Sequence, residues 1–393
     1  MTNFLFTIPY ITFFCILFIA FLISKIDDPY IQNLSLFFCN VSAIVFIGCR
    51  GYIYSDWFIY ATKFDKYPIF PDGINLIIKA ITESSQESAF VLFNIICKSI
   101  YNDYLFFQFV NFIFEIILLN LILKRYVPKY YILGFLFYFI FLGMTYSFIL
   151  IRNIKAILLF LVSIRYIEKK QPVKYFALNT IGLLFHSSAI IYFPLYFFIN
   201  KRPNDKFILF IYFTGLILFL FQFPIATNIF SLLADLIGVG RYYGLIIRYL
   251  NSSQWSAPYG ISIGLIERVF SFLFIFYHRK ILYEKSLIFI NCFYIYSFIF
   301  VWLSDFGIIF DRMGALFVFS YCVLYINIYS ILSKKHKIVF LCLFLTFSLL
   351  RMIVSVNNPD AKYENIFTGI MSRTERRAYV RPFHNYIGKI ADY

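Results

Sequence analysis

Residues 146–188 read YSFILIRNIKAILLFLVSIRYIEKKQPVKYFALNTIGLLFHSS, and this stretch decides the fold. It is mostly apolar, yet it contains Arg152, Lys155 and His186. A charge inside a membrane segment costs about 2.5–3.5 kcal/mol on insertion scales, so a charge kept there generally has a function. We expect Arg152 and His186 to meet at the extracytoplasmic end of a helix bundle, where they would act on a lipid-linked anionic substrate.

The composition defines an all-α integral membrane protein. Hydrophobic residues make up 61% of the 393 residues and charged residues only 14%, whereas a soluble protein carries about 25% charged residues. The seven cysteines form no CxxC pair and no Cys/His set with zinc spacing, so we expect no disulfide, structural metal or cofactor. The segment 7–24 lacks a basic start and a small-residue cleavage site, which favours a first span over a signal peptide.

A membrane span needs about 20 mostly apolar residues. The sequence predicts about twelve transmembrane helices in one domain, 1–354, followed by a tail, 355–393. The pair at 174–200 is either one long span or a hairpin that turns at His186. The predicted spans are 4–24, 30–49, 104–123, 130–149, 151–167, 174–186, 188–200, 206–223, 261–277, 286–303, 313–332 and 338–354.

Basic residues indicate the orientation of these spans. Compact lysine-rich clusters occur in alternate connections, as the positive-inside rule expects of cytoplasmic loops. Counting 174–200 as two passes keeps all the clusters on one side, which favours the hairpin and places both termini outside. The clusters contain Lys25, Lys124, Arg125, Lys129, Lys169, Lys170, Lys174, Lys201, Arg202, Lys206, Arg279, Lys280, Lys285, Lys334, Lys335 and Lys337.

The opposite, outer side receives the longer segments 50–103 and 224–260 together with the tail 355–393. Arginine outnumbers lysine in the two later segments and is interspersed with tyrosine. Arginine offers a planar fork to phosphate, and aromatic rings suit sugars. We therefore expect an anionic ligand on this side. Within 50–103, residues 86–99 predict an amphipathic surface helix because they are too short and too polar to span.

Each candidate residue in this pattern also has a purely structural interpretation. Arg152, which shares a helix face with Lys155, either binds the ligand or extends to the membrane surface. His186 either orients or deprotonates a hydroxyl group, or is a neutral core histidine bonded to Ser187 or a backbone carbonyl. Asp56 is the leading outer carboxylate, or else it caps a helix that begins at Trp57.

Four further arginines are candidates for binding phosphate or sugar. Arg268 lies about 10 Å inside its predicted span, beside Glu267. Arg241 and Arg248 share a helix face, which is either a binding platform or an interfacial helix. Arg312 follows Asp311 and forms either an ion pair or a phosphate contact.

The chain contains no GxGxxG, P-loop, HExxH or DxD sequence. A metal-dependent transferase that uses nucleotide sugars is therefore disfavoured. A flippase is also disfavoured because the ionisable residues are concentrated on one side. A membrane acyltransferase would not need this many outer arginines.

Several motifs together resemble the EpsG/Wzy family of polysaccharide polymerases. The segment Arg50-Gly51…Ser55-Asp56-Trp57…Tyr60 is similar to the family's Arg…Gly-Thr-Asp…Tyr loop, and Glu87-Ser-Ala-Phe90 to its Glu-Pro-Gly-Phe segment. Ile151-Arg152-Asn153 and Phe185-His186-Ser187-Ser188 resemble its Ile-Arg-Gln and Phe-His-x-Ser motifs. The order of further matches also agrees with the family, namely Arg241-Tyr242-Tyr243, Arg268, Arg312 and Tyr379…Pro382-Phe383-His384-Asn385-Tyr386.

This resemblance implies an O-antigen or related surface-polysaccharide polymerase of the bacterial inner membrane with a GT-C-like helical fold. Such an enzyme moves a glycan from undecaprenyl pyrophosphate to a new lipid-linked repeat unit at the periplasmic face. Its partners would be undecaprenyl-pyrophosphate-linked oligosaccharides, the lipid bilayer and a chain-length regulator, with no nucleic acid. His186, Asp56 and Arg152 would be catalytic, and the substrate would bind Arg50, Tyr60, Arg241, Arg248, Arg268 and Arg312. An O-antigen ligase or a flippase remains the alternative.

Overall fold

The computed structural model describes residues 4–139, 144–252 and 256–383. Within these residues every regular element is a helix, apart from two isolated bridges that join Arg50 to Asn365 and Asn365 to Gly369. The predicted all-α class is therefore confirmed. The chain forms two compact units, one of residues 1–193 with 332–393 and the other of residues 194–331.

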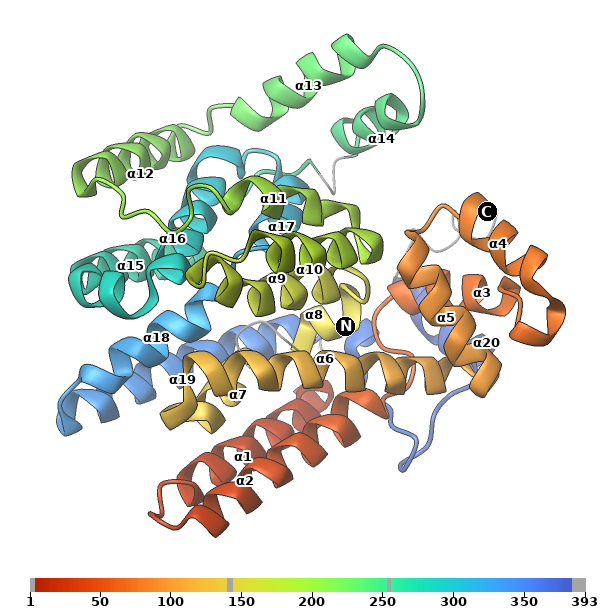
Figure 1. Cartoon of the computed structure of the whole chain (residues 1–393), viewed down its shortest axis with the longest axis horizontal. Coiled ribbons are helices and arrows are strands. Elements are labelled where there is room, and N and C mark those ends of the chain that lie inside the picture. Colours follow the sequence, from red (N-terminus) through yellow and green to blue (C-terminus); the bar gives the residue numbers. More distant parts are fainter. Residues whose placement is uncertain (1–3, 140–143, 253–255, 384–393) are drawn as a thin grey trace. The chain divides into compact units, whose positions relative to one another are not determined.

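The first unit begins with an antiparallel helix pair (Figure 1). The turn between its helices is set by Asp28, whose carboxylate accepts from the backbone N–H groups of Tyr30 and Ile31, and by Pro29 in the first helical turn. The helices up to the predicted outer segment are η1 (Phe4–Thr7), α1 (Ile8–Ile23), α2 (Pro29–Ala43) and the π-helix η2 (Ile44–Gly48).

The segment 50–103 folds into short helices rather than a span. The helix predicted at 86–99 is found as α5, and six of its residues, including Phe90 and Val91, are buried. Figure 1 shows α3, α4 and α5 gathered at one end of α6. The elements are α3 (Asp56–Lys66), η3 (Phe70–Asp72), α4 (Ile74–Glu83) and α5 (Ser88–Ile100).

Helix α6 (Tyr104–Tyr126) is the long central helix of this unit and packs on α9. Gln108, Asn111 and Glu115 are buried at spacings of three and four, so α6 turns one polar stripe inward. On its other side Ile117 and Leu121 are about half exposed, as expected of a lipid-facing surface. The elements that follow are η4 (Pro128–Tyr130), α7 (Tyr131–Tyr138), α8 (Met144–Ile149), α9 (Asn153–Glu168), α10 (Pro172–Phe185) and η6 (Ser187–Ile191).

The chain turns at His186, where the hairpin at 174–200 was predicted, but the second predicted span, 188–200, is not one helix: it contains most of η6 and a four-residue helix at Tyr192–Leu195. That 174–200 makes two membrane passes stays a prediction. Helix α10 ends at Phe185, and His186 has extended backbone angles, φ −158° and ψ 128°. The chain then returns along α10, because the Tyr175 hydroxyl donates to the Tyr192 carbonyl at 2.5 Å. The helical order breaks at His186 as the sequence predicted.

The C-terminal segment completes the first unit. After α19 (Lys334–Val356), the chain packs against the beginning of the molecule: the Tyr10 hydroxyl donates to the Ala361 carbonyl at 2.5 Å. The predicted tail, 355–393, is thus packed against the first helices as far as Phe383. Residues 384–393, with the predicted motif residues His384, Asn385 and Tyr386, lie outside the described part. The last elements are η7 (Pro359–Ala361), α20 (Arg373–Val380) and η8 (Arg381–Phe383).

The second unit is built around α16, which packs on α12 and α18. Helix α16 starts seven residues before the predicted span and bends at Ser286, where that span was expected to begin. A short helix, α11 (Tyr192–Leu195), runs across the boundary between the units. The elements of the second unit are α12 (Asp205–Leu220), α13 (Ile225–Ile237), α14 (Arg241–Leu250), α15 (Ile263–Tyr277), α16 (Arg279–Leu303), α17 (Gly307–Gly314) and α18 (Ser320–Ile331).

Five helical stretches of the described residues are long and apolar enough to cross a membrane, or six if α12 and α13, which meet at 87°, form one broken span. The protein is therefore a multi-pass membrane protein. Several predicted spans are shorter or interrupted; in 313–332, for example, a turn at 315–319 lies between the end of α17 and the start of α18 at Ser320. The span predicted at 130–149 includes residues 140–143, which lie outside the described part. The five stretches are Phe4–Ile23, Pro29–Gly48, Tyr104–Tyr126, Arg279–Leu303 and Lys334–Val356.

Gly215 permits the close approach of α12 to α16. A Cβ atom at this position would lie 2.5 Å from Nε1 of Trp302, which itself donates to the Ile211 carbonyl. We expect G215A to destabilise the protein by about 1–3 kcal/mol through overpacking. G244A is the matched control, because a Cβ at Gly244 in α14 meets nothing within 4 Å. Thermal unfolding in detergent should show a lower Tm for G215A alone; equal Tm values would contradict this packing.

Candidate functional site

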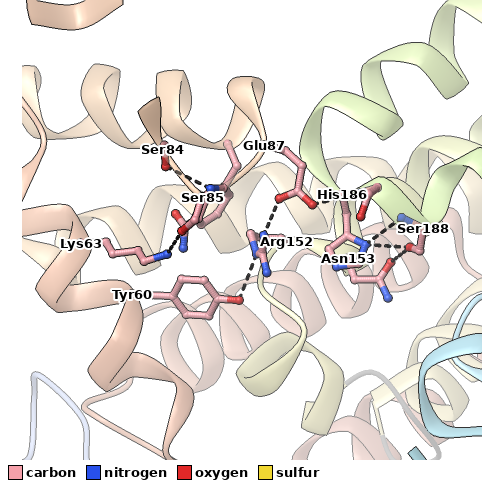
Figure 2. A network of polar contacts seen from close by, with 12 residues as sticks. Tyr60, Lys63, Ser84, Ser85, Glu87, Arg152, Asn153, His186 and Ser188 are labelled. Atoms are coloured by element: carbon pink, nitrogen blue, oxygen red, sulfur yellow. Dashed lines mark hydrogen bonds and ion pairs between the residues drawn. The ribbon is translucent and has the colours of Figure 1, made fainter. Parts of the chain in front are cut away.

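A polar network joins four segments of the first unit. Tyr60 comes from the middle of α3, Glu87 immediately precedes α5, and Arg152 immediately precedes α9. His186 lies just after α10. Figure 2 shows Arg152 between Tyr60 and Glu87, with His186 nearby. The network is thus formed by tertiary folding and not by one sequence motif.

Arg152 and Glu87 form an ion pair at the centre of this network, in which Nη1 of Arg152 donates to Oε2 of Glu87. Nε of Arg152 also donates to the Tyr60 hydroxyl at 3.1 Å. The two charged side chains keep 24% and 19% of their surface exposed, so a ligand could reach them. The guanidinium is therefore held in one orientation while remaining accessible.

The Glu87 carboxylate also fixes the turn that carries His186, because its Oε1 accepts from the backbone N–H of Ser187 at 3.0 Å. Burial alone would raise the pKa of Glu87, but the Arg152 guanidinium and the Ser187 N–H outweigh burial and hold this pKa below its ordinary value. Glu87 is thus a carboxylate at neutral pH, better suited to orienting Arg152 than to accepting a proton.

His186 is oriented by Ser188. Its Nδ1 lies 2.7 Å from the Ser188 hydroxyl oxygen and accepts from the Ser188 N–H at 3.2 Å. The Ser188 hydroxyl in turn donates to Oδ1 of Asn153, the residue after Arg152, at 2.9 Å. Because these contacts engage Nδ1, any proton exchanged with a substrate would pass through Nε2. Two routes therefore connect Arg152 with the turn at His186: one through Glu87 to the Ser187 N–H, and one through Asn153 to the Ser188 hydroxyl.

Lys155 lies beneath Arg152 and is fully buried. Its ammonium donates to the side chain of Asn111 and to the Ile151 carbonyl, and it lies within 6 Å of the ring centroids of Phe90 and Phe93. Arg152 and Lys155 were predicted to share a helix face, but Arg152 precedes the first residue of α9, and only Arg152 is accessible. Lys155 instead supports the interior polar stripe of α6.

The structure places Arg50 in the interior, with 2% of its surface exposed. Its guanidinium donates to the carbonyls of Ile47 and Ser147 at 2.7 and 3.2 Å. Asp56 is the first residue of α3, one position earlier than the start expected at Trp57, and it is one helical turn from Tyr60. The predicted roles of Arg50 and Asp56 toward a substrate stay predictions.

In the second unit Arg268 is buried in an aromatic cage. Its guanidinium carbon lies 4.4, 5.1 and 5.8 Å from the ring centroids of Phe300, Phe310 and Tyr259, and its Nε donates to the Tyr296 hydroxyl at 3.2 Å. Its neighbour Glu267 accepts from Ser271. The two charges thus have separate partners, as expected for adjacent helical residues.

The other predicted arginines of this unit are on shorter helices. Arg248 in α14 and Arg312 in α17 are both exposed. Arg241 is the first residue of α14, but its side chain lies outside the described part, as does Trp255 of the same predicted loop. Asp311 accepts from the Tyr259 hydroxyl at 2.6 Å. The substrate contacts expected of Arg241, Arg248, Arg268 and Arg312 stay predictions.

The tail arginines, expected to form a basic outer surface, differ from one another. Arg376 is fully buried and donates to Glu364 at 3.2 Å. Arg373 pairs with Asp65 of α3, and the Arg377 guanidinium lies 3.7 Å from the Phe58 ring centroid. Arg373 and Arg377 therefore attach the tail to α3, whereas Arg376 holds the tail together internally.

Sequence reasoning did not select Glu87, Asn153 or Ser188 as site residues. All three lie within the quoted family motifs, so the motifs contained the signal, but composition and spacing alone did not. The first unit brings together Tyr60, Arg152 and His186 of the predicted set. Nowhere among the described residues do three or more His, Cys, Asp or Glu side chains gather as a metal site would require.

The fold and this site define a multi-pass helical membrane protein with an accessible Arg–Glu–His network at the ends of its helices. The sequence model of the EpsG family matches residues 33–367. The chain belongs to the EpsG family. Comparisons with curated proteins and with solved structures found no match.

The depressed pKa of Glu87 gives a pH-dependent prediction. A carboxyl whose pKa is lower in the folded than in the unfolded state stabilises the fold above its unfolded pKa of about 4.3 and loses that contribution as the pH falls through its folded pKa. We expect E87Q to have a lower Tm than the wild type at pH 7, with the difference shrinking below about pH 4.

The control for this experiment is E83Q, which removes a carboxylate from the exposed end of α4. Thermal unfolding of all three proteins in detergent across this pH range measures the effect. An E87Q curve that coincides with the wild-type curve at every pH would show that the ion pair does not stabilise the fold.

Proposed function

We propose that the protein is a surface-polysaccharide polymerase of the O-antigen type. It transfers a growing glycan from undecaprenyl pyrophosphate to the sugar of a new lipid-linked repeat unit. Membership of the EpsG family supports polymerisation of a polysaccharide at a membrane. The network of Arg152, Glu87, Tyr60 and His186 is the observation that carries the proposal, because it offers a preorganised cation next to a candidate base.

The leaving group is the first requirement of this reaction. The bond from the anomeric carbon to the pyrophosphate oxygen breaks, and negative charge develops on the pyrophosphate. The Arg152 guanidinium, held in place by Tyr60, would stabilise that charge. The pyrophosphate would compete with Glu87 for Arg152, with the planar fork suited to two phosphate oxygens. No metal ion is needed in this scheme, and activity in the presence of a chelator tests that part.

The acceptor hydroxyl is the second requirement. Its oxygen forms the new bond to the anomeric carbon and its proton passes to Nε2 of His186, or to Asp56 if that carboxylate is the base. Because attack and departure occur on opposite faces of the sugar, a single displacement inverts the anomeric configuration. The Ser188–Asn153 contacts would hold the imidazole ring in one orientation during this step.

The remaining parts of the proposal concern the setting of the reaction. We place the site at the periplasmic face of the inner membrane, in a twelve-span GT-C-like bundle. Arg50, Arg241, Arg248, Arg268 and Arg312 are proposed to contribute to binding of pyrophosphate or sugar. A chain-length regulator would be the protein partner, and no nucleic acid is involved.

We expect R152A and H186A each to lower polymer formation by about 100-fold or more, the usual cost of losing one transition-state donor or a general base. R152K should recover only part of the activity, because lysine lacks the planar fork. The matched control is K79A, which removes a positive charge from the exposed face of α4. Polymer length on gels and the amount of membrane-inserted protein are the measurements, and wild-type polymer in R152A and H186A would refute the site.

Deletion of the protein from its host distinguishes the alternatives. Loss of a polymerase leaves single repeat units on the acceptor. Loss of a ligase instead leaves long chains that are unattached, and loss of a flippase leaves units facing the cytoplasm. We expect single units, with full-length polymer restored by the wild-type chain and by K79A but not by H186A. Either of the other two phenotypes would replace the proposed function.

A further inference from the structure

A second polar feature lies at the other end of α6 and α9. A cavity of about 350 Å³ is lined there by Lys124 and Arg125 of α6, by Arg165 of α9 and by the apolar side chains of Leu121, Ile122, Tyr126 and Val162. Arg165 is thirteen positions after Arg152, which corresponds to about 20 Å along a helix. The cavity is therefore separate from the network around Arg152, and the proposed reaction does not use it.

The cavity is lined by three basic side chains, of which only Arg125 forms an ion pair within the described part of the chain. Arg125 is paired with Glu168 at 2.6 Å. Arg165 donates through Nη2 to the Tyr166 hydroxyl at 2.6 Å, whereas its Nε is buried without a hydrogen-bond partner among the described residues. Lys124 is exposed. Both α6 and α9 end here, and the negative C-terminal ends of their dipoles disfavour an anion. The basic side chains must therefore supply the attraction.

The walls indicate what kind of anion fits. One wall is formed by Leu121, Ile122 and Val162, and Leu121 is 50% exposed on the apolar surface of α6. A volume of about 350 Å³ is at the small end of the range for ligand pockets. Basic pockets between membrane helices on the cytoplasmic side bind anionic lipid headgroups. An apolar wall next to a basic rim suits a phosphate that carries an acyl chain.

We infer that this cavity binds a phosphate group, with the phosphodiester of an anionic lipid as its source. Lys124 and Arg165 contact the phosphate, Arg125 remains tied to Glu168, and the exposed side of Leu121 borders the lipid chain. The function of the site is to anchor the ends of α6 and α9 to the headgroup layer. This role is independent of the proposed polymerase activity.

The test uses the full chain, purified and exposed to mixed phosphatidylglycerol and phosphatidylcholine, with retained lipid counted by native mass spectrometry. The wild type should retain phosphatidylglycerol preferentially. K124Q/R165Q should reduce that retention by about fivefold per lost charge. K169Q/K170Q also removes two positive charges, but from the exposed residues just after α9, and this variant should retain as much phosphatidylglycerol as the wild type.

A second variant avoids dependence on the folding of K124Q/R165Q. L121W fills the cavity from its half-exposed edge without changing the charge, and it should also reduce retention. Millimolar inorganic phosphate distinguishes the sources: if it displaces the lipid from the wild type, the site accepts a free phosphate as well, and if it does not, the lipid chain is required. Equal retention by L121W and the wild type, or equal losses in the two charge variants, would overturn the assignment.

Discussion

The structure depends on one constraint, which is that a charge enclosed by apolar helices must have a partner. Arg152 is at the beginning of α9 with Glu87 and Tyr60 as its partners. Without Glu87 the guanidinium would lose its ion pair, and the turn at Ser187 would lose its acceptor. The same constraint explains the interior: Lys155 is held by Asn111, and Glu115 accepts from the Tyr138 hydroxyl at 2.9 Å. Polar contacts thus determine where the helices begin and how they face one another.

The site combines two kinds of restraint on its reactive groups. Arg152 is fixed by side chains from the outer segment 50–103, whereas His186 is fixed by residues adjacent to it and by Asn153. The Arg152–Glu87 ion pair keeps 24% and 19% of its two side chains exposed, so an anionic ligand can reach it. In the proposed reaction the ligand would take the place of Glu87 on the planar guanidinium.

Local features of this fold were predictable from sequence because they depend on nearby residues. The apolar runs gave the helices near 4–24, 30–49, 104–123 and 338–354, and the break at His186 followed from the short halves around it.

Long-range pairing was not predictable in the same way. Glu87 is 65 positions from Arg152, and nothing in its own surroundings shows which cation it meets. Arg376 is a further example: in sequence it looks like part of a basic surface, but Glu364 and the carbonyls of Asp360 and Lys362 hold it in the interior. The turn at 315–319, which leaves only Ser320–Ile331 of the predicted span 313–332 as α18, is likewise not visible in its hydropathy.

The attachment of residues 359–380 to α1 and α3 affects the order in which the molecule can be assembled. Tyr10 meets Ala361, Asp65 meets Arg373, and Asn365 bridges to Arg50. The N-terminal helices emerge from the ribosome long before these partners exist. During synthesis, helix α3, which carries Tyr60, therefore lacks its contacts with residues 359–380 until the chain beyond α19 has been made. The surroundings of Tyr60 are completed last, although its own helix is made early.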